Sequence, residues 1–305
     1  MPDLVVVGNL TIDEIQTDDS NPITAMGGTA MYASLAARER GIGVGIVSKV
    51  GFDFPDEYVR RLRGVGINVD RLKRVPKTVT TRFSLRYRGE TRALRLLGRC
   101  EDMGVSDVQE MRSRALHIGA VAGEVPTEMV RFLADRCEIL SIDLQGFTRS
   151  FDNRGHVRLK EGIDMGALDP AAIVKCSREE LLAATGEERI VRAARIVKNR
   201  GPDTLLVTMG PRGSLLFHGD RCHEIPAYEP EKIVDVTGAG DVFVGSFIAE
   251  FLKGRDLLWC ASIASSSSSL TLERRGVWLG SKSELERRAS LISQRIKEIS
   301  SKAQM

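Results

Sequence analysis

Short runs of apolar, β-branched residues alternate with stretches of helical spacing along most of the chain. Leu4-Val5-Val6-Val7 ends at Gly8, which is typical of a buried strand in a parallel sheet. Similar strands are predicted at 44–47, 116–119, 139–143, 172–175 and 204–208. Helices are predicted from Gly27-Gly28 to about Gly41, over 57–63 and 127–135, twice within 177–199, and over 239–253, 256–272 and 282–299. The repeated strand–helix units predict an α/β fold, with a doubly wound, mostly parallel sheet and helices on both faces.

Two segments have a different pattern. Residues 11–16 and 78–97 alternate apolar and polar side chains, and Arg88-Gly89-Glu90 has the composition of a turn. The pattern predicts a half-exposed strand and a hairpin that together form a small β-sheet standing off the main sheet.

No internal repeat and no long polar linker interrupts the chain, so we expect a single domain over residues 1–305. The one low-complexity segment is the serine run 265–269. A flexible linker is one reading of such a run, but apolar residues at helical spacing flank it and favour a helix with a small-residue face.

Composition narrows the class of protein. The 44 basic and 41 acidic residues give a net charge of +3, which argues against a nucleic-acid-binding protein. Five scattered cysteines without a CxxC pair predict buried thiols rather than disulfides or a zinc site. No apolar run approaches the roughly 20 residues of a membrane helix. We therefore expect a cytoplasmic protein that contacts neither membrane nor nucleic acid.

The segment richest in chemistry is Asp235-Val236-Thr237-Gly238-Ala239-Gly240-Asp241, which leads directly into an apolar helix. Backbone N–H groups at a helix start are unpaired and carry partial positive charge, and glycine lets a phosphate approach them. A carboxylate such as Asp241 beside that site is suited to accept the proton of an attacking hydroxyl. A glycine-rich loop before a helix with an acidic first turn is also common without any catalytic role.

The complete string resembles the C-terminal signature of the ribokinase-like (PfkB) family of carbohydrate and nucleoside kinases. The resemblance implies that Asp241 is the catalytic base and that the N–H groups of Gly238, Ala239 and Gly240 form an anion hole. It also implies that the protein transfers the γ-phosphate of ATP, with Mg²⁺, to a hydroxyl of a small molecule. A monovalent cation is a further cofactor that the resemblance allows.

Further stretches resemble the family in its chain order. Asp13, after the first strand, resembles the aspartate that binds sugar hydroxyls, and Gly27-Gly28 resembles the substrate-side glycine pair. Val50-Gly51-Phe52-Asp53 resembles a "VGxD" turn. The segment from Thr208 through Gly210 to Gly213 resembles the nucleotide-binding strand and turn, which would place nucleotide there and along the helix at 256–272. The segments 11–16 and 78–97 fit the family's substrate lid.

Two positions depart from the family pattern. Tyr32 stands where sugar kinases of the family usually carry an Asn. The acidic "NxxE" motif corresponds to Ser177-Arg178-Glu179-Glu180, with Ser177 in place of Asn. The resemblance links this motif to the magnesium and phosphate environment, and so implies Ser177 as a cofactor-binding residue and Glu180 as a metal ligand. A serine followed three residues later by glutamate is also a helix capping box, and Glu180 is expected in that role first.

The loop after the strand 139–143 lies where ligands bind in open α/β sheets. The string Asp143-Leu144-Gln145-Gly146-Phe147-Thr148-Arg149, together with Tyr32 and the opening strand, resembles the myo-inositol kinase branch. That resemblance implies a cyclic polyol as acceptor, bound by Asp13, Tyr32, Gln145 and Arg149. Ribose, 2-keto-3-deoxygluconate and nucleosides are the alternative acceptors.

Two other classes of protein are disfavoured by the sequence. A non-catalytic sugar- or nucleotide-binding protein on this fold is disfavoured by the intact Gly-Ala-Gly-Asp segment. A nicotinamide-dependent oxidoreductase is disfavoured because no GxGxxG follows the first strand. We expect a monomer, or a homodimer that pairs through exposed lid strands.

Overall fold

The computed structural model describes residues 1–17, 21–88 and 91–299. Within these residues the main sheet has ten strands. Their order across the sheet differs from their order along the chain, because several connections cross over neighbouring strands. From edge to edge they are β16 (Lys297–Ile299), β15 (Arg221–Ile225), β14 (Ser214–His218), β13 (Thr204–Thr208), β12 (Ile173–Ser177), β9 (Cys137–Asp143), β8 (Ser113–Ile118), β1 (Leu4–Val7), β4 (Val44–Gly51) and β5 (Ile67–Val75).

The strands from β13 to β5 are parallel, whereas β14, β15 and β16 are antiparallel to their neighbours. Parallel strands are expected to be covered on both faces, and two apolar cores flank this sheet. One core contains side chains of α4 (Thr127–Ala134), α6 (Arg178–Thr185) and α7 (Ile190–Lys198). The other contains side chains of α1 (Thr29–Glu39), α8 (Ala239–Leu252) and α10 (Lys282–Ser293). The doubly wound prediction is confirmed.

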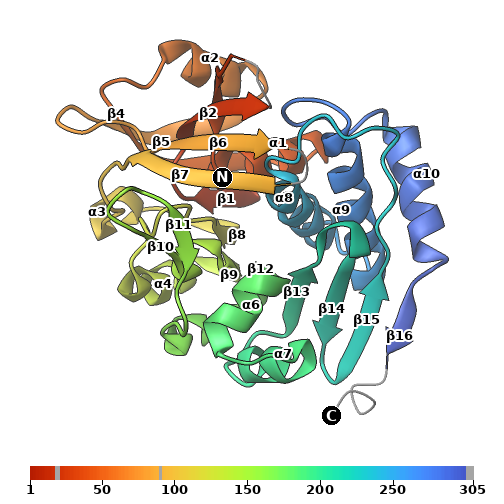
Figure 1. Ribbon diagram of the computed structural model, residues 1–305. Coiled ribbons are helices and arrows are strands. Elements are labelled where there is room, and N and C mark those ends of the chain that lie inside the picture. The colour runs from red at the N-terminus through yellow and green to blue at the C-terminus, as the bar shows by residue number, and fades with distance from the viewer. Residues whose placement is uncertain (18–20, 89–90, 300–305) are drawn as a thin grey trace.

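A four-stranded sheet, the lid, lies beside the pair α1 and α8 (Figure 1). Its order is β3 (Ile23–Gly27), β2 (Thr11–Thr17), β6 (Arg82–Arg88) and β7 (Thr91–Gly98). Ile15, Phe83 and Leu85 form its apolar face, which packs on Val121 and Ala122. The predicted lid is present, although the hairpin begins at Arg82 rather than at residue 78. Gly89 and Glu90 of the predicted turn lie outside the described residues.

Shorter elements complete the chain. They are α2 (Asp56–Gly64), α3 (Val105–Val108), α5 (Gln145–Thr148), the pair β10 (Arg149–Phe151) and β11 (Val157–Leu159), and the 3₁₀ turns Met165–Leu168 and Gly210–Arg212. None of the helices in the described part of the chain is long and apolar enough to cross a membrane. All five cysteines are free; four are buried and Cys137 is half-buried.

The C-terminal helices differ in one place from the prediction. Helix α9 (Leu257–Leu272) includes the serine run, and most of those serines are buried, so the helix interpretation is confirmed. The helix predicted over 282–299 was wrong beyond Ser293, because residues Lys297–Ile299 form β16 instead. There the backbone pairs with the open edge of β15, in register Cys222↔Ile299, and this pairing outweighs the local helical pattern.

Candidate active site

A cavity of about 300 Å³ opens between the lid and the carboxyl ends of the parallel strands. Phe83, Leu85 and Leu94 of the lid form the apolar part of its lining, and the N-terminal turns of α1 and α8 line it as well. Most of the predicted site residues line this cavity: Asp13, Gly28, Tyr32, Gln145, Arg149, Ser177, Glu180, Thr208, Gly238, Ala239, Gly240 and Asp241. Residues far apart in the sequence therefore meet at one place, as the ligand rule for open α/β sheets predicts.

Helix α8 begins immediately after Gly238, which has φ of +76°. A β-carbon at Gly238 would lie within 2.3 Å of the Tyr32 ring, so the ring can only pack there against a glycine. The first N–H groups of α8 have no partner inside the helix and carry the positive end of its dipole. The Ser268 hydroxyl of α9 donates a hydrogen bond to the Ala239 carbonyl oxygen at 2.8 Å, and this contact holds the turn against α9. The turn has the geometry of an anion-binding site.

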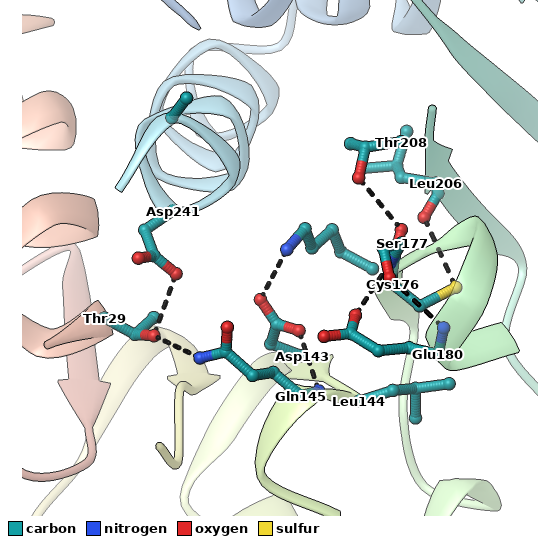
Figure 2. A network of polar contacts seen from close by, with 12 residues as sticks. Thr29, Asp143, Leu144, Gln145, Cys176, Ser177, Glu180, Leu206, Thr208 and Asp241 are labelled. Atoms are coloured by element: carbon teal, nitrogen blue, oxygen red, sulfur yellow. Dashed lines mark hydrogen bonds and ion pairs between the residues drawn. The ribbon is translucent and has the colours of Figure 1, made fainter. Parts of the chain in front are cut away.

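Asp241 lies in the first turn of α8. Thr29 Oγ1, from the first residue of α1, donates to Asp241 Oδ1 at 2.8 Å, and Gln145 Nε2 donates to Thr29 Oγ1 at 3.4 Å (Figure 2). Burial raises the pKa of Asp241 to about 6; Asp143 adds to this, whereas Lys175, Thr29 and Arg149 oppose it. A carboxylate poised near neutral pH is suited to general-base chemistry.

The acceptor side of the cavity, where the residues predicted to bind the acceptor lie, contains hydrogen bonds between polar side chains. Thr11 Oγ1 donates to Asp13 Oδ1 at 2.7 Å, and Arg149 Nη2 donates to Gln145 Oε1 at 2.6 Å. Gly27 is not part of the cavity wall; it makes room for Asp13, since a β-carbon there would lie 2.0 Å from Asp13 Oδ2. The side chains that line this end of the cavity offer both hydrogen-bond donors and acceptors.

Tyr32 lies between this acceptor side and the Gly238 turn. Burial, and then the negative charges of Asp13, Asp235 and Asp241, raise the pKa of its phenol well above the usual value. The hydroxyl therefore stays protonated and can donate a hydrogen bond.

Ser177 and Glu180 form the capping box that the sequence predicted. Glu180 Oε2 accepts from the Ser177 N–H at 2.7 Å, and the Glu180 N–H donates to Ser177 Oγ at 3.2 Å. Among the described residues, no group of three or more His, Cys, Asp or Glu side chains could hold a metal ion. Mg²⁺ is usually held by one or two carboxylates together with substrate phosphates and water. Glu180, which lines the cavity, fits such a partial contribution, and its metal role stays a prediction.

The glycines of the predicted nucleotide turn lie outside the cavity wall. Gly210 and Gly213 have φ of +59° and +84°, and a β-carbon at Gly213 would lie 2.1 Å from the Ile225 carbonyl oxygen. Gly213 is thus required by the turn between β13 and β14, whereas Thr208 at the end of β13 lines the cavity. Their role in nucleotide binding stays a prediction.

Several residues of the site were not predicted as functional from the sequence. Thr29 and Lys175 line the cavity, and Asp143, 2.8 Å from the Lys175 ammonium, lies directly beneath it. Tyr87 of the lid hydrogen-bonds Thr237 at 2.7 Å and so links the lid to the segment before Gly238. A lysine inside an otherwise apolar strand, Ile173-Val174-Lys175-Cys176, was the signal that could have identified Lys175.

Known proteins resemble the chain over nearly its full length. The profile of the pfkB family carbohydrate kinases matches residues 1–283. A cytidine kinase of Thermococcus kodakarensis is 29% identical over 91% of this chain and 99% of its own. An inositol 3-kinase of Arabidopsis thaliana is 25% identical over 90% of this chain and 74% of its own. A solved pyrophosphate-dependent kinase of the ribokinase family, complexed with a pyrophosphate analog and myo-inositol, has a TM-score of 0.79 and 21% identity over 93% of this chain and 99% of its own.

Proposed function

Since the chain belongs to the pfkB family of carbohydrate kinases, which transfer a phosphoryl group to an alcohol, we propose that Asp241 is the general base of this transfer. The observation that carries the proposal is the placement of Asp241 beside the Gly238–Gly240 turn at the start of α8, with Thr29 holding its carboxylate at 2.8 Å. A hydroxyl bound next to Asp241 would lose its proton to Oδ2 or Oδ1 as its oxygen attacks phosphorus. At the same time the bond from phosphorus to the bridging oxygen of the donor would break, and the rest of the donor would leave with that electron pair. The N–H groups of Gly238, Ala239 and Gly240 would stabilise the charge that develops on the phosphoryl oxygens.

We propose ATP as the phosphoryl donor, bound with its phosphates at this turn and extending along Thr208 to Gly213 and α9. Mg²⁺ bound to the donor phosphates would neutralise charge, and Glu180 is the side chain placed to assist. Pyrophosphate is a second candidate donor, because a solved protein of this fold binds a pyrophosphate analog together with myo-inositol. The cytoplasm, where thiols stay reduced, suits the five free cysteines and is the proposed location.

The proposed acceptor is a small polyol or sugar, and myo-inositol is the first candidate. Asp13, Tyr32, Gln145 and Arg149 supply the hydrogen-bonding groups that several ring hydroxyls would need. The likeness to an inositol 3-kinase over most of the chain supports this acceptor.

Cytidine is the second candidate acceptor. The lid wall of Phe83, Leu85 and Leu94 is apolar and could cover the flat face of a base, while the polar side contacts the ribose. The cytidine kinase that matches over 99% of its length supports this alternative.

The test is product formation with each donor, ATP or pyrophosphate, across myo-inositol, ribose, fructose, 2-keto-3-deoxygluconate, adenosine and cytidine, in Na⁺ and in K⁺. We expect a phosphate monoester of one acceptor, with a clear preference in kcat/KM for myo-inositol. Preference for cytidine would replace the acceptor and keep Asp241 as base. Absence of product with every pair would contradict the proposed reaction.

A further inference from the structure

A lysine and an aspartate form a buried ion pair directly beneath the anion-binding turn. Lys175 lies on β12 and is 5% exposed, and Asp143 at the end of β9 is fully buried. Their atoms Nζ and Oδ2 are 2.8 Å apart. A β-carbon built on Gly240 would lie 3.1 Å from Lys175 Nζ, which places the ammonium against the turn that begins α8.

The two partners face different surroundings. Asp143 uses both carboxylate oxygens inside the protein, because Oδ2 accepts from Lys175 and Oδ1 accepts from the Gln145 N–H at 3.0 Å. Lys175 lines the cavity, and within the described part of the chain its one hydrogen bond goes to Asp143. An ammonium has three N–H donors, so two of them stay available to a ligand in the cavity. Asp143 is thereby a fixed support, and Lys175 is the group that meets the ligand.

Stability alone gives little reason to keep this pair. The free energy needed to remove the two charges from water is about as large as the free energy gained from their attraction. Replacing such a pair with well-packed apolar residues therefore often leaves the stability of a protein unchanged. Ile173, the neighbour of Lys175 on the same face of β12, is apolar and buried, so an apolar residue would suit this face of the strand. The ammonium also stays charged: burial works against it, but Asp143, Glu180 and Asp241 raise its pKa above the usual value.

We infer that Lys175 is a catalytic residue that contacts the transferring phosphoryl group, and that Asp143 is the positioning residue that holds it. The inference deepens the proposed phosphotransfer and rests on it. A fixed positive charge beside the N–H groups of Ala239 and Gly240 would stabilise the phosphoryl oxygens most strongly in the transition state. Ser177, which stands where the family motif has Asn, accepts the Glu180 N–H in the cap of α6. Lys175, on the same strand, adds a positive charge to the wall of the cavity.

The test compares Lys175→Met with the double variant Lys175→Met/Asp143→Leu, which leaves no unpaired buried charge. We expect the double variant to unfold near the wild-type temperature, while its kcat falls at least ~100-fold and its donor KM changes less. The matched control is Arg40→Met/Glu250→Leu. This pair is also buried, at 8% and 3% exposure with Nη2 and Oε1 2.9 Å apart, but it lies at the far ends of α1 and α8. Its kcat should stay unchanged.

The pH profile adds a readout that a purely structural role would not move. Lys175 lowers the pKa of Asp241 and Asp143 raises it, while Thr29 and Arg149 also face this carboxyl and lower its pKa. The acid limb of kcat/KM should therefore move to higher pH in Lys175→Met and move less in the double variant. Lys175→Gln, which is polar, takes the place of the Met variant if that protein does not fold.

Binding of inorganic pyrophosphate, measured by calorimetry, separates this inference from the proposed reaction. We expect at least ~10-fold weaker binding in Lys175→Met, as for loss of a charge-assisted hydrogen bond. A wild type that binds pyrophosphate but phosphorylates no acceptor would contradict the proposed reaction alone. Unchanged kcat in the double variant, or, for a wild type without turnover, unchanged pyrophosphate binding, would overturn the inference about Lys175.

Discussion

Asp241 owes its properties to neighbours from several separate elements. Thr29 at the start of α1 holds the carboxylate, and Lys175 on β12, Asp143 on β9 and Arg149 on β10 set the charge around it. Burial is the largest influence and keeps its pKa near neutrality. A base of this kind exchanges protons readily at the pH of the cell.

The pKa of Asp241 predicts the pH dependence of the reaction. The base must be ionised to accept a proton, and its pKa in the free protein is about 6. We expect kcat/KM to be level above this pH and to fall about tenfold per unit below it. Steady-state rates from pH 4.5 to 8 measure this limb. A rate that stays level down to pH 4.5 would mean that Asp241 is not the base.

The way the two helices begin matters as much as any side chain. Gly28 and Gly238, both with positive φ, immediately precede helices α1 and α8 as their N-cap residues. Helix α8 packs so closely on α1 that a β-carbon on Gly245 would lie 2.3 Å from the Ala33 carbonyl oxygen. This contact holds Thr29, Tyr32 and Asp241 at fixed separations.

Gly238→Ala is expected to damage the site beyond the cost of its backbone conformation. A non-glycine residue at positive φ costs ~1–2 kcal/mol, and here a methyl group would also collide with the Tyr32 ring. Gly254→Ala, beyond the other end of α8, is the matched control, because its φ is +74° but nothing lies within 4 Å of the added carbon. Chemical denaturation and turnover should show a modest stability loss with full kcat for Gly254→Ala. Gly238→Ala should lose more stability and most of its kcat. Equal behaviour of the two variants would contradict the close packing of Tyr32 on the turn.

Much of the architecture could be predicted from the chain alone. The buried strands are short β-branched runs, and parallel order follows from their alternation with helices, so the sheet and most helices were expected. The strands β3, β5, β10, β11, β14 and β15 were not predicted. In β15 the residues Arg221-Cys222-His223-Glu224-Ile225 are mixed in polarity and become a strand through pairing with β14.

The candidate site likewise contains residues that the sequence could predict and residues that it could not. Asp241, Gly238 and Asp13 could be predicted as site residues, because their glycine turns and carboxylates resemble the family's motifs and occur in the family's chain order. Lys175 and Thr29 could not be selected, because each looks like an ordinary strand or helix residue until the fold brings Thr29 within 2.8 Å of Asp241 and Lys175 within 2.8 Å of Asp143. Asp143 begins the loop string that resembles inositol kinases, but no role was predicted for it. The single-domain organisation and the oligomeric state stay predictions.

The assignment of Asp241 as base is tested most directly by Asp241→Asn. The amide keeps the shape of the side chain but cannot accept the proton, so kcat should fall at least ~100-fold. Binding of the donor, measured by calorimetry, should stay close to that of the wild type, because the N–H groups of Gly238, Ala239 and Gly240 are unchanged. Near-normal turnover in Asp241→Asn would contradict the account.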